Sequence, residues 1–127
     1  NQPVEAWDVG QVSSMWNMFT ATAFNQPVEA WDVGQVSSMW NMFTATAFNQ
    51  PVAAWDVGQV TSMQSMFYYA SVFNQPVATW DVGQVTTMQA MFYTATVFNQ
   101  PVEAWNIGKV TKMQYMFRSA TAFNQPV

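Results

Sequence analysis

The sequence contains no cysteine and no histidine, and only 8% of its 127 residues are charged. Without cysteine there can be no disulfide bond and no thiolate metal site. The commonest acid–base and nucleophilic side chains of enzymes are also missing. The sequence therefore predicts a protein that is not an enzyme and that holds no cofactor and no metal.

Positive charge and long apolar runs are scarce as well. Three lysine and arginine residues against seven aspartate and glutamate residues give a net charge of −4. Because there is no basic stripe, we do not expect nucleic acid as a partner. No apolar run reaches the length of about 18 residues that a membrane helix needs, so no membrane span is expected in this segment. No signal peptide is visible and the chain starts inside a repeat, which we interpret as part of a longer array.

What the sequence has instead is repetition. The tripeptide Asn-Gln-Pro recurs every 24 or 25 residues, starting at Asn1, Asn25, Asn49, Asn74, Asn99 and Asn124. A fixed period in this range is typical of solenoids, in which each repeat is one coil stacked on the next. We divide the chain into a single segment of five coils, at 1–24, 25–48, 49–73, 74–98 and 99–123, with 124–127 beginning a sixth.

Apolar residues fall at the same positions of every coil. The ten methionines occupy two positions, typified by Met15 and Met18, and the ten phenylalanines occupy two more, typified by Phe19 and Phe24. A further position, that of Trp7, is tryptophan in all five coils. Because stacked coils place equivalent residues about 4.8 Å apart, we expect these positions to form continuous apolar columns in a core.

Local patterns predict the path of each coil. Residues 12–16 are the best strand candidate, and Met-x-x-Met-Phe is compatible with a short helical turn. Asp8 is expected to cap a turn in which Gly10 takes a positive φ. Asn1 and its copies are expected to form an internal ladder that satisfies backbone groups at a bend. The predicted class is α/β, mostly β and turns, with one short parallel strand and a short helical turn per coil.

The repeat motif Phe-Asn-Gln-Pro-Val-x-x-Trp-Asp-Val-x-x-Val-x-x-Met-x-x-Met-Phe resembles that of the BspA-type leucine-rich-repeat-like surface proteins, also described as the 26-residue lipoprotein repeat. The resemblance covers the whole chain. It implies a right-handed leucine-rich-repeat-like solenoid and a secreted or cell-surface setting, often with a role in adhesion. Two departures concern the shape of a corner: Gly10 and its copies replace a small polar residue, and the first two coils are one residue short.

Candidate contact residues lie where the coils differ. Ser14 and Trp16 flank the core residue Met15, so alternation along a strand would point them outward, together with Ser38 and Trp40 in coil two. Two adjacent exposed tryptophans predict a contact site for protein or sugar. The alternative is an offset strand that buries Trp16.

All three positive charges lie in coil five, at Lys109, Lys112 and Arg118, whereas coils one to four carry six of the seven acidic residues. This polarity is either the drift of one repeat or a device by which the basic end of one molecule docks on the acidic end of another. Open ends of a repeat stack expose unpaired backbone edges and apolar core, which favours such docking.

Carboxylates recur at the positions of Glu5 and Asp8. Copies about 5 Å apart would match the separation in a retaining glycosidase, but equal copies do not separate an acid from a nucleophile. We therefore expect turn-capping aspartates, with a calcium site as the alternative. The Thr-Ala-Thr pattern at 20–22 is reminiscent of ice-binding proteins, but it lies at the turn of variable length.

We expect a non-catalytic structural or adhesive module of an extracellular surface protein. In this interpretation it serves as a fibre or appendage subunit that packs, laterally or end to end, against itself or other surface proteins. The alternative is a recognition module that binds a glycan or a host protein through the exposed aromatic face. Ice binding is a remote third.

Overall fold

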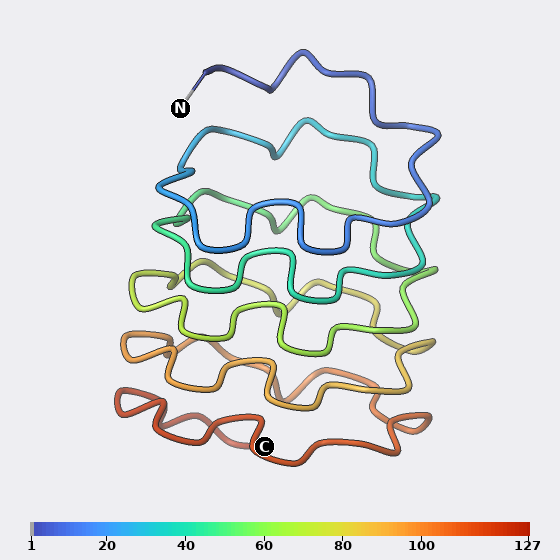
Figure 1. Ribbon diagram of the computed structural model, residues 1–127. Helices are drawn as coiled ribbons and strands as arrows, with labels where there is room; N and C mark the ends of the chain where they lie inside the picture. Colours follow the sequence, from blue (N-terminus) through green and yellow to red (C-terminus); the bar gives the residue numbers. More distant parts are fainter. Residues whose placement is uncertain (1) are drawn as a thin grey trace.

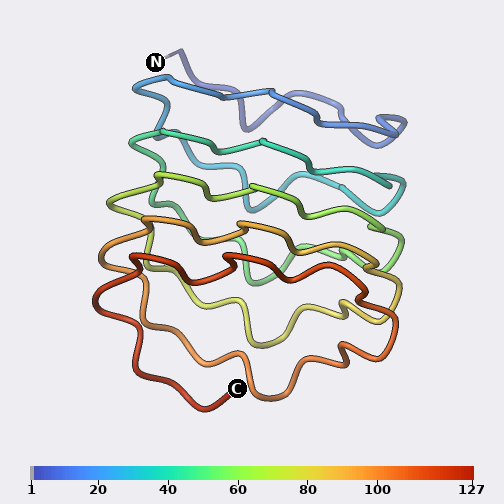
Figure 2. The ribbon, with the colours of Figure 1, turned by 60° about the horizontal axis from the view of Figure 1, so that its bottom comes forward.

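The chain winds as a stack of similar turns. The computed structural model describes residues 2–127, and in it each sequence repeat makes one circuit that lies directly on the circuit before it (Figure 1). The colours follow one another in order along the stack in both views, and the two termini lie at opposite ends (Figures 1 and 2). Each coil therefore contacts only its sequence neighbours, and the two end coils each have one open face.

Residues 2–127 contain no helix and no strand longer than one bridge residue. Parallel bridges join Ser14 to Ser38, and then continue through Ser62, Thr87 and Lys112. The predicted α/β solenoid of leucine-rich-repeat type, with a short parallel strand and a short helical turn in every coil, is therefore wrong. The fold consists mostly of loops and turns. Within the described residues, no helix is long and apolar enough to cross a membrane.

Left-handed residues explain why neither a strand nor a helical turn forms. In coil one Asn17 has a φ of 56° and Ala21 a φ of 54°, and the equivalent residues of the other four coils are left-handed too. A left-handed residue stops both a pleated strand and a right-handed helical turn, because its backbone leaves both regions of conformational space. The candidate strand at 12–16 thus ends at the single bridge residue Ser14.

Hydrogen bonds between coils nevertheless run through this segment. The amides of Met15, Asn17, Phe19 and Ala21 donate to carbonyls of coil two at 2.7–3.1 Å, while the intervening amide of Met18 donates to Met15 of its own coil. In an ordinary parallel strand, alternate amides and carbonyls would bond to the two neighbouring strands. Here alternate amides turn back into their own coil, which produces the crenellated path visible in Figure 1.

The apolar columns meet inside the stack. In coil three the side chains of Val52, Trp55, Met63, Phe67 and Phe73 are all buried. Phenylalanine rings stack both within a coil, as Phe67 does on Phe73 at 4.0 Å, and between coils, as Phe43 does on Phe67 at 5.6 Å. The predicted columns therefore form the core, and they are exposed only at the ends of the stack, for example at Trp7 and Met113.

The predicted asparagine ladder is confirmed from Asn25 onward. The side-chain oxygen of Asn49 accepts the amide of Asn74 at 3.0 Å, and the same oxygen accepts Nε2 of Gln75 at 3.1 Å. The same arrangement recurs at the other described repeats. The Asn-Gln pair thus satisfies backbone groups at the bend and ties each coil to the next. The first member of the predicted ladder, Asn1, lies outside the described residues.

The aspartate turn forms as expected, but its glycine has a different role. Oδ1 of Asp56 accepts the amide of Gly58 at 3.0 Å, and the other coils repeat this cap, with Asn106 in place of aspartate in coil five. No glycine of residues 2–127 has a positive φ, so the predicted reason for glycine is wrong. A Cβ on Gly58 would lie 3.1 Å from Oδ1 of Asp56, which is a tight contact, so glycine favours the close approach of the cap.

Candidate binding surfaces

The two tryptophans that distinguish coils one and two lie together on the outside of the stack. Trp16 is 56% exposed and Trp40 is 38% exposed. Their rings are stacked, with centroids 5.3 Å apart and an interplanar angle of 10°. They occupy the position just before the left-handed residue, where the backbone turns and directs the side chain away from the core. The outward direction predicted for Trp16 is thus what the structure shows, and its role in contact stays a prediction.

Ser14 and Ser38 hold the backbone beneath this pair. The two residues are joined by a parallel bridge, and each hydroxyl accepts the amide of the tryptophan two residues later at 3.4 Å. Ser14 is exposed and Ser38 is half-buried. The serines therefore position the aromatic pair and add a small polar margin beside it.

A second aromatic surface was missed by the sequence analysis. Tyr68 stacks on Tyr93 at 4.9 Å and lies 4.8 Å from Tyr69. The guanidinium of Arg118 lies 6.0 Å from the ring centre of Tyr93 and 5.4 Å from that of Tyr115, within cation–π range. We name Tyr68, Tyr69, Tyr93, Tyr115 and Arg118 the tyrosine cluster.

Tyr68, Tyr93 and Arg118 occupy one position of the repeat, whereas Tyr69 and Tyr115 come from two others. The left-handed turns on both sides of Met-Phe bring them together. One signal was present in the sequence, since all four tyrosines lie in coils three to five. Desolvation by burial, followed by the neighbouring phenols of Tyr69 and Tyr93, raises the pKa of the Tyr68 hydroxyl above its ordinary value.

The structure places the three cations of coil five against different neighbours. Arg118 belongs to the tyrosine cluster, whereas Nζ of Lys109 donates to Oε1 of Gln84 at 2.7 Å. Lys112 is exposed and bridges to Thr87. The cations thus do not form a single basic site, but all belong to the same end coil.

The aspartates and several threonines have structural partners. The aspartates cap the glycine turns, and no group of three or more acidic side chains able to hold a metal ion occurs among residues 2–127. Thr20 Oγ1 donates to the carbonyl of Asn41 at 2.7 Å, and Thr46 is buried. The Thr-Ala-Thr segments therefore do not present a regular row of free hydroxyls.

Comparison with known families gives one result. A family model described as "Mycoplasma protein of unknown function, DUF285" matches the chain twice, over residues 1–75 and over residues 44–127, so that the two matches together include every repeat. No curated protein and no solved structure matches the chain.

Proposed function

This chain belongs to the family described as Mycoplasma protein of unknown function DUF285, and we propose that it is a non-catalytic structural and adhesive module of an extracellular surface protein. The likeness of its repeat motif to the BspA-type surface proteins supports that setting. The low charge supports it too, because a neutral polar surface offers little like-charge repulsion to close contact.

The stacked pair of Trp16 and Trp40 is the observation on which the adhesive role rests. Exposed large aromatic side chains in contact with each other are unusual on a polar surface and mark sites of interaction. Because the two indoles are already held in place, they lose less conformational entropy when a partner binds. The serines beneath them and the intercoil hydrogen bonds fix the backbone that carries both rings.

A glycan is the second candidate partner of the Trp16–Trp40 pair, and the geometry of the two rings favours it. Stacking with centroids 5.3 Å apart covers one face of each ring, and the outer face of Trp16, the more exposed of the two, forms an apolar platform backed by Trp40. The apolar C–H face of a sugar ring can stack on such a platform while its hydroxyls bond to water and to the polar margin. A flat protein surface of mixed character would be the other occupant.

The test compares single variants of three exposed tryptophans. Binding of the labelled chain to immobilised mucin, and to the same mucin after enzymatic removal of its glycans, is measured at concentrations where the chain is monomeric. We expect Trp16→Ala and Trp40→Ala each to weaken binding by about tenfold or more, as for a central aromatic contact. Trp7→Ala serves as the matched control, because Trp7 is 55% exposed but belongs to the core column and not to the Trp16–Trp40 pair.

Loss of binding after deglycosylation would assign the platform to sugar, and retained binding would assign it to protein. Equal binding by the unchanged chain and by both platform variants would contradict the adhesive role of this face.

A further inference from the structure

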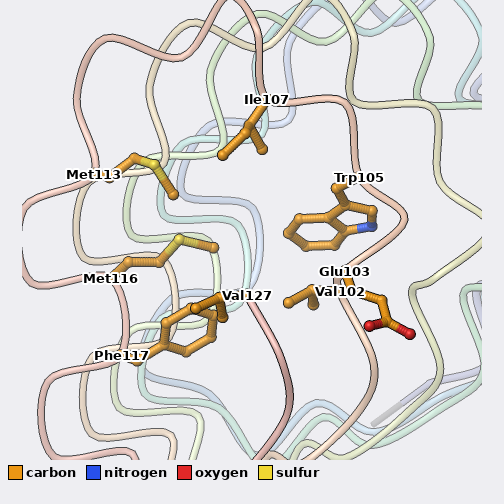
Figure 3. A pocket seen from close by; sticks show the side chains of 8 residues that line it. All are labelled: Val102, Glu103, Trp105, Ile107, Met113, Met116, Phe117 and Val127. Carbon is orange, nitrogen blue, oxygen red and sulfur yellow. The ribbon is translucent and has the colours of Figure 1, made fainter.

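A cavity of about 230 Å³ at coil five is lined mainly by apolar side chains. Trp105, Met116 and Phe117 of the apolar columns are among them, and the carboxylate of Glu103 lies at the edge of the group (Figure 3). The same columns form the core of the other coils, so the cavity is part of the core and not a separate site. Side chains that can react gather instead on the outside of coils three and four.

Three phenol rings of coils three and four are in mutual contact. The rings of Tyr68 and Tyr93 are stacked with centroids 4.9 Å apart, and the ring of Tyr69 lies 4.8 Å from the first and 5.7 Å from the second. Tyr69 is 47% exposed, whereas the other two residues are half-buried. We name these three residues the tyrosine trio. Coils three and four each have a neighbouring coil on both sides, so the trio belongs to the interior of the stack.

Backbone hydrogen bonds hold the trio together. The amide of Tyr69 donates to the carbonyl of Tyr93 at 2.8 Å, and the amide of Tyr68 donates to the carbonyl of Ser65 in its own coil at 3.2 Å. Tyr69 is also one of the left-handed residues, with a φ of 57°. The contact between its ring and that of Tyr93 is therefore fixed by the path of two neighbouring coils and does not depend on a chance meeting of flexible side chains.

We propose that the tyrosine trio is a site of oxidative cross-linking, at which a carbon–carbon bond between the rings of Tyr69 and Tyr93 joins coil three to coil four. The bond forms between the ring carbons next to the two hydroxyl-bearing carbons and gives a dityrosine. The oxidant is hydrogen peroxide, used by a peroxidase. This inference goes beyond the proposed function, because it involves neither Trp16 nor Trp40 and does not require adhesion.

The reaction consumes one molecule of hydrogen peroxide for each cross-link. The peroxidase removes an electron and a proton from the exposed phenol of Tyr69, and the radical then passes to Tyr93, which contacts it. A second one-electron oxidation of Tyr69 places two radicals side by side, and they couple. The hydrogen on each coupled carbon moves to the oxygen of its own ring, which restores both phenols. In total the protein loses two hydrogen atoms, the O–O bond of the peroxide breaks and two water molecules form.

The orientation of the rings selects Tyr93 as the partner of Tyr69. The new bond lies in the plane of both rings, so rings that meet at a tilt form it more readily than rings that lie face to face. Tyr69 and Tyr93 meet at 42°, whereas Tyr68 and Tyr93 are nearly parallel at 16°. Tyr68 and Tyr69 are tilted by 58°, but they are neighbours in sequence. A bond between them would close a small, strained ring that contains two flat aromatic systems and a planar peptide.

A bond between coils three and four should stabilise the stack. It closes the loop between residues 69 and 93, as a disulfide bond would, and thereby removes conformational entropy from the unfolded chain. The sequence has no cysteine with which to form such a link. We therefore expect the cross-linked chain to unfold at a higher temperature than the untreated chain.

Treatment of the full chain with a peroxidase and hydrogen peroxide tests the proposal. Low protein concentration keeps bonds between molecules rare, and the treated monomer is then unfolded and cleaved before each aspartate. This cleavage separates Tyr69, in residues 56–80, from Tyr93, in residues 81–127. We expect the two fragments to be joined, with a mass lower than their sum by that of two hydrogen atoms and with the fluorescence of dityrosine.

Phenylalanine variants identify the two rings, because phenylalanine has no hydroxyl hydrogen to lose. Tyr69→Phe and Tyr93→Phe should each abolish the joined fragments, whereas Tyr68→Phe should keep them. Tyr115→Phe is the matched control and should also keep them. The ring of Tyr115 is 57% exposed, but it takes part in none of the tyrosine–tyrosine contacts of residues 2–127.

Two results would overturn the proposal. The first is an unchanged chain whose fragments stay separate while the peroxidase couples free tyrosine in the same solution. The second is joined fragments that persist in Tyr69→Phe or in Tyr93→Phe, since the bond would then lie elsewhere. Neither result would bear on the adhesive face, which contains no tyrosine.

Discussion

At the scale of single residues, the indole of each interior tryptophan makes two contributions to stability. Its ring fills space between coils, and its N–H satisfies a carbonyl of the coil before. The acceptor for Trp55 is the carbonyl of Val28, which also accepts the backbone amide of Trp31. Loss of the indole N–H would therefore leave this buried carbonyl with one of its two bonds.

We expect Trp55→Phe to lower the free energy of unfolding by about 1–3 kcal/mol, from the lost hydrogen bond and the smaller ring together. Trp7→Phe makes the same chemical change at an exposed position, where residues 2–127 supply no acceptor for the indole N–H, and should alter stability by less than about 0.5 kcal/mol. Urea unfolding followed by circular dichroism measures both. Equal effects of the two substitutions would show that the indole bond contributes nothing.

At the scale of the element, each coil is built from a ribbon of turns whose corners are left-handed residues. Asparagine, alanine, serine, tyrosine and threonine all occur at these corners, and glycine occurs at none of them. An alanine held there costs roughly 1–2 kcal/mol relative to the right-handed region. The hydrogen bonds to the neighbouring coils hold these residues in place.

Replacing such an alanine by glycine should therefore not destabilise the chain. Ala45 is exposed with a φ of 53°, whereas Ala54 is exposed and is not left-handed. We expect Ala45→Gly to be neutral or to stabilise by up to about 1 kcal/mol, because strain relief outweighs the added chain entropy. Ala54→Gly should destabilise by about 0.5–1 kcal/mol. A comparison of the two midpoints of thermal unfolding tests this, and the reverse order would contradict the assigned strain.

The corners also show where sequence reasoning reaches its limit. Period, core columns, aspartate cap and asparagine ladder all followed from side chains that recur at fixed positions. The backbone path after Met15 did not, because Ala21 carries no local signal for a left-handed conformation and the asparagine preference of Asn17 is absent from coils three to five. The preceding β-branched residues favour a strand instead. By contrast, alternation around Met15 did indicate that Trp16 faces outward. Three members of the tyrosine cluster share one column, but the addition of Tyr69 and Tyr115 depends on the path of the turn and could not be read from that column.

At the scale of the whole molecule, stability is distributed along a one-dimensional stack of coils. A residue of the core is covered from both sides in coil three but from one side in coil five. Met63 is fully buried, whereas its equivalent Met113 is 38% exposed. The same substitution should therefore have different costs at the two places.

We expect Met63→Ala to lower the free energy of unfolding by about 2–5 kcal/mol, as cavity-forming substitutions do. Met113→Ala should cost less than about 1 kcal/mol. Both are measured by urea unfolding at low protein concentration, where association between molecules does not cover coil five. A large cost at Met113 under these conditions would show that the end coil is as well protected as the middle of the stack.

Hydrogen bonds that join equivalent residues of successive coils have one more consequence. Each junction between two coils is made by nearly the same residues. Insertion or removal of one whole repeat therefore leaves every remaining junction intact. The fold itself therefore sets no preferred number of coils. Duplication or loss of a repeat in the gene would change the length of the stack in steps of one coil, so the number of repeats in the coding sequence sets that length.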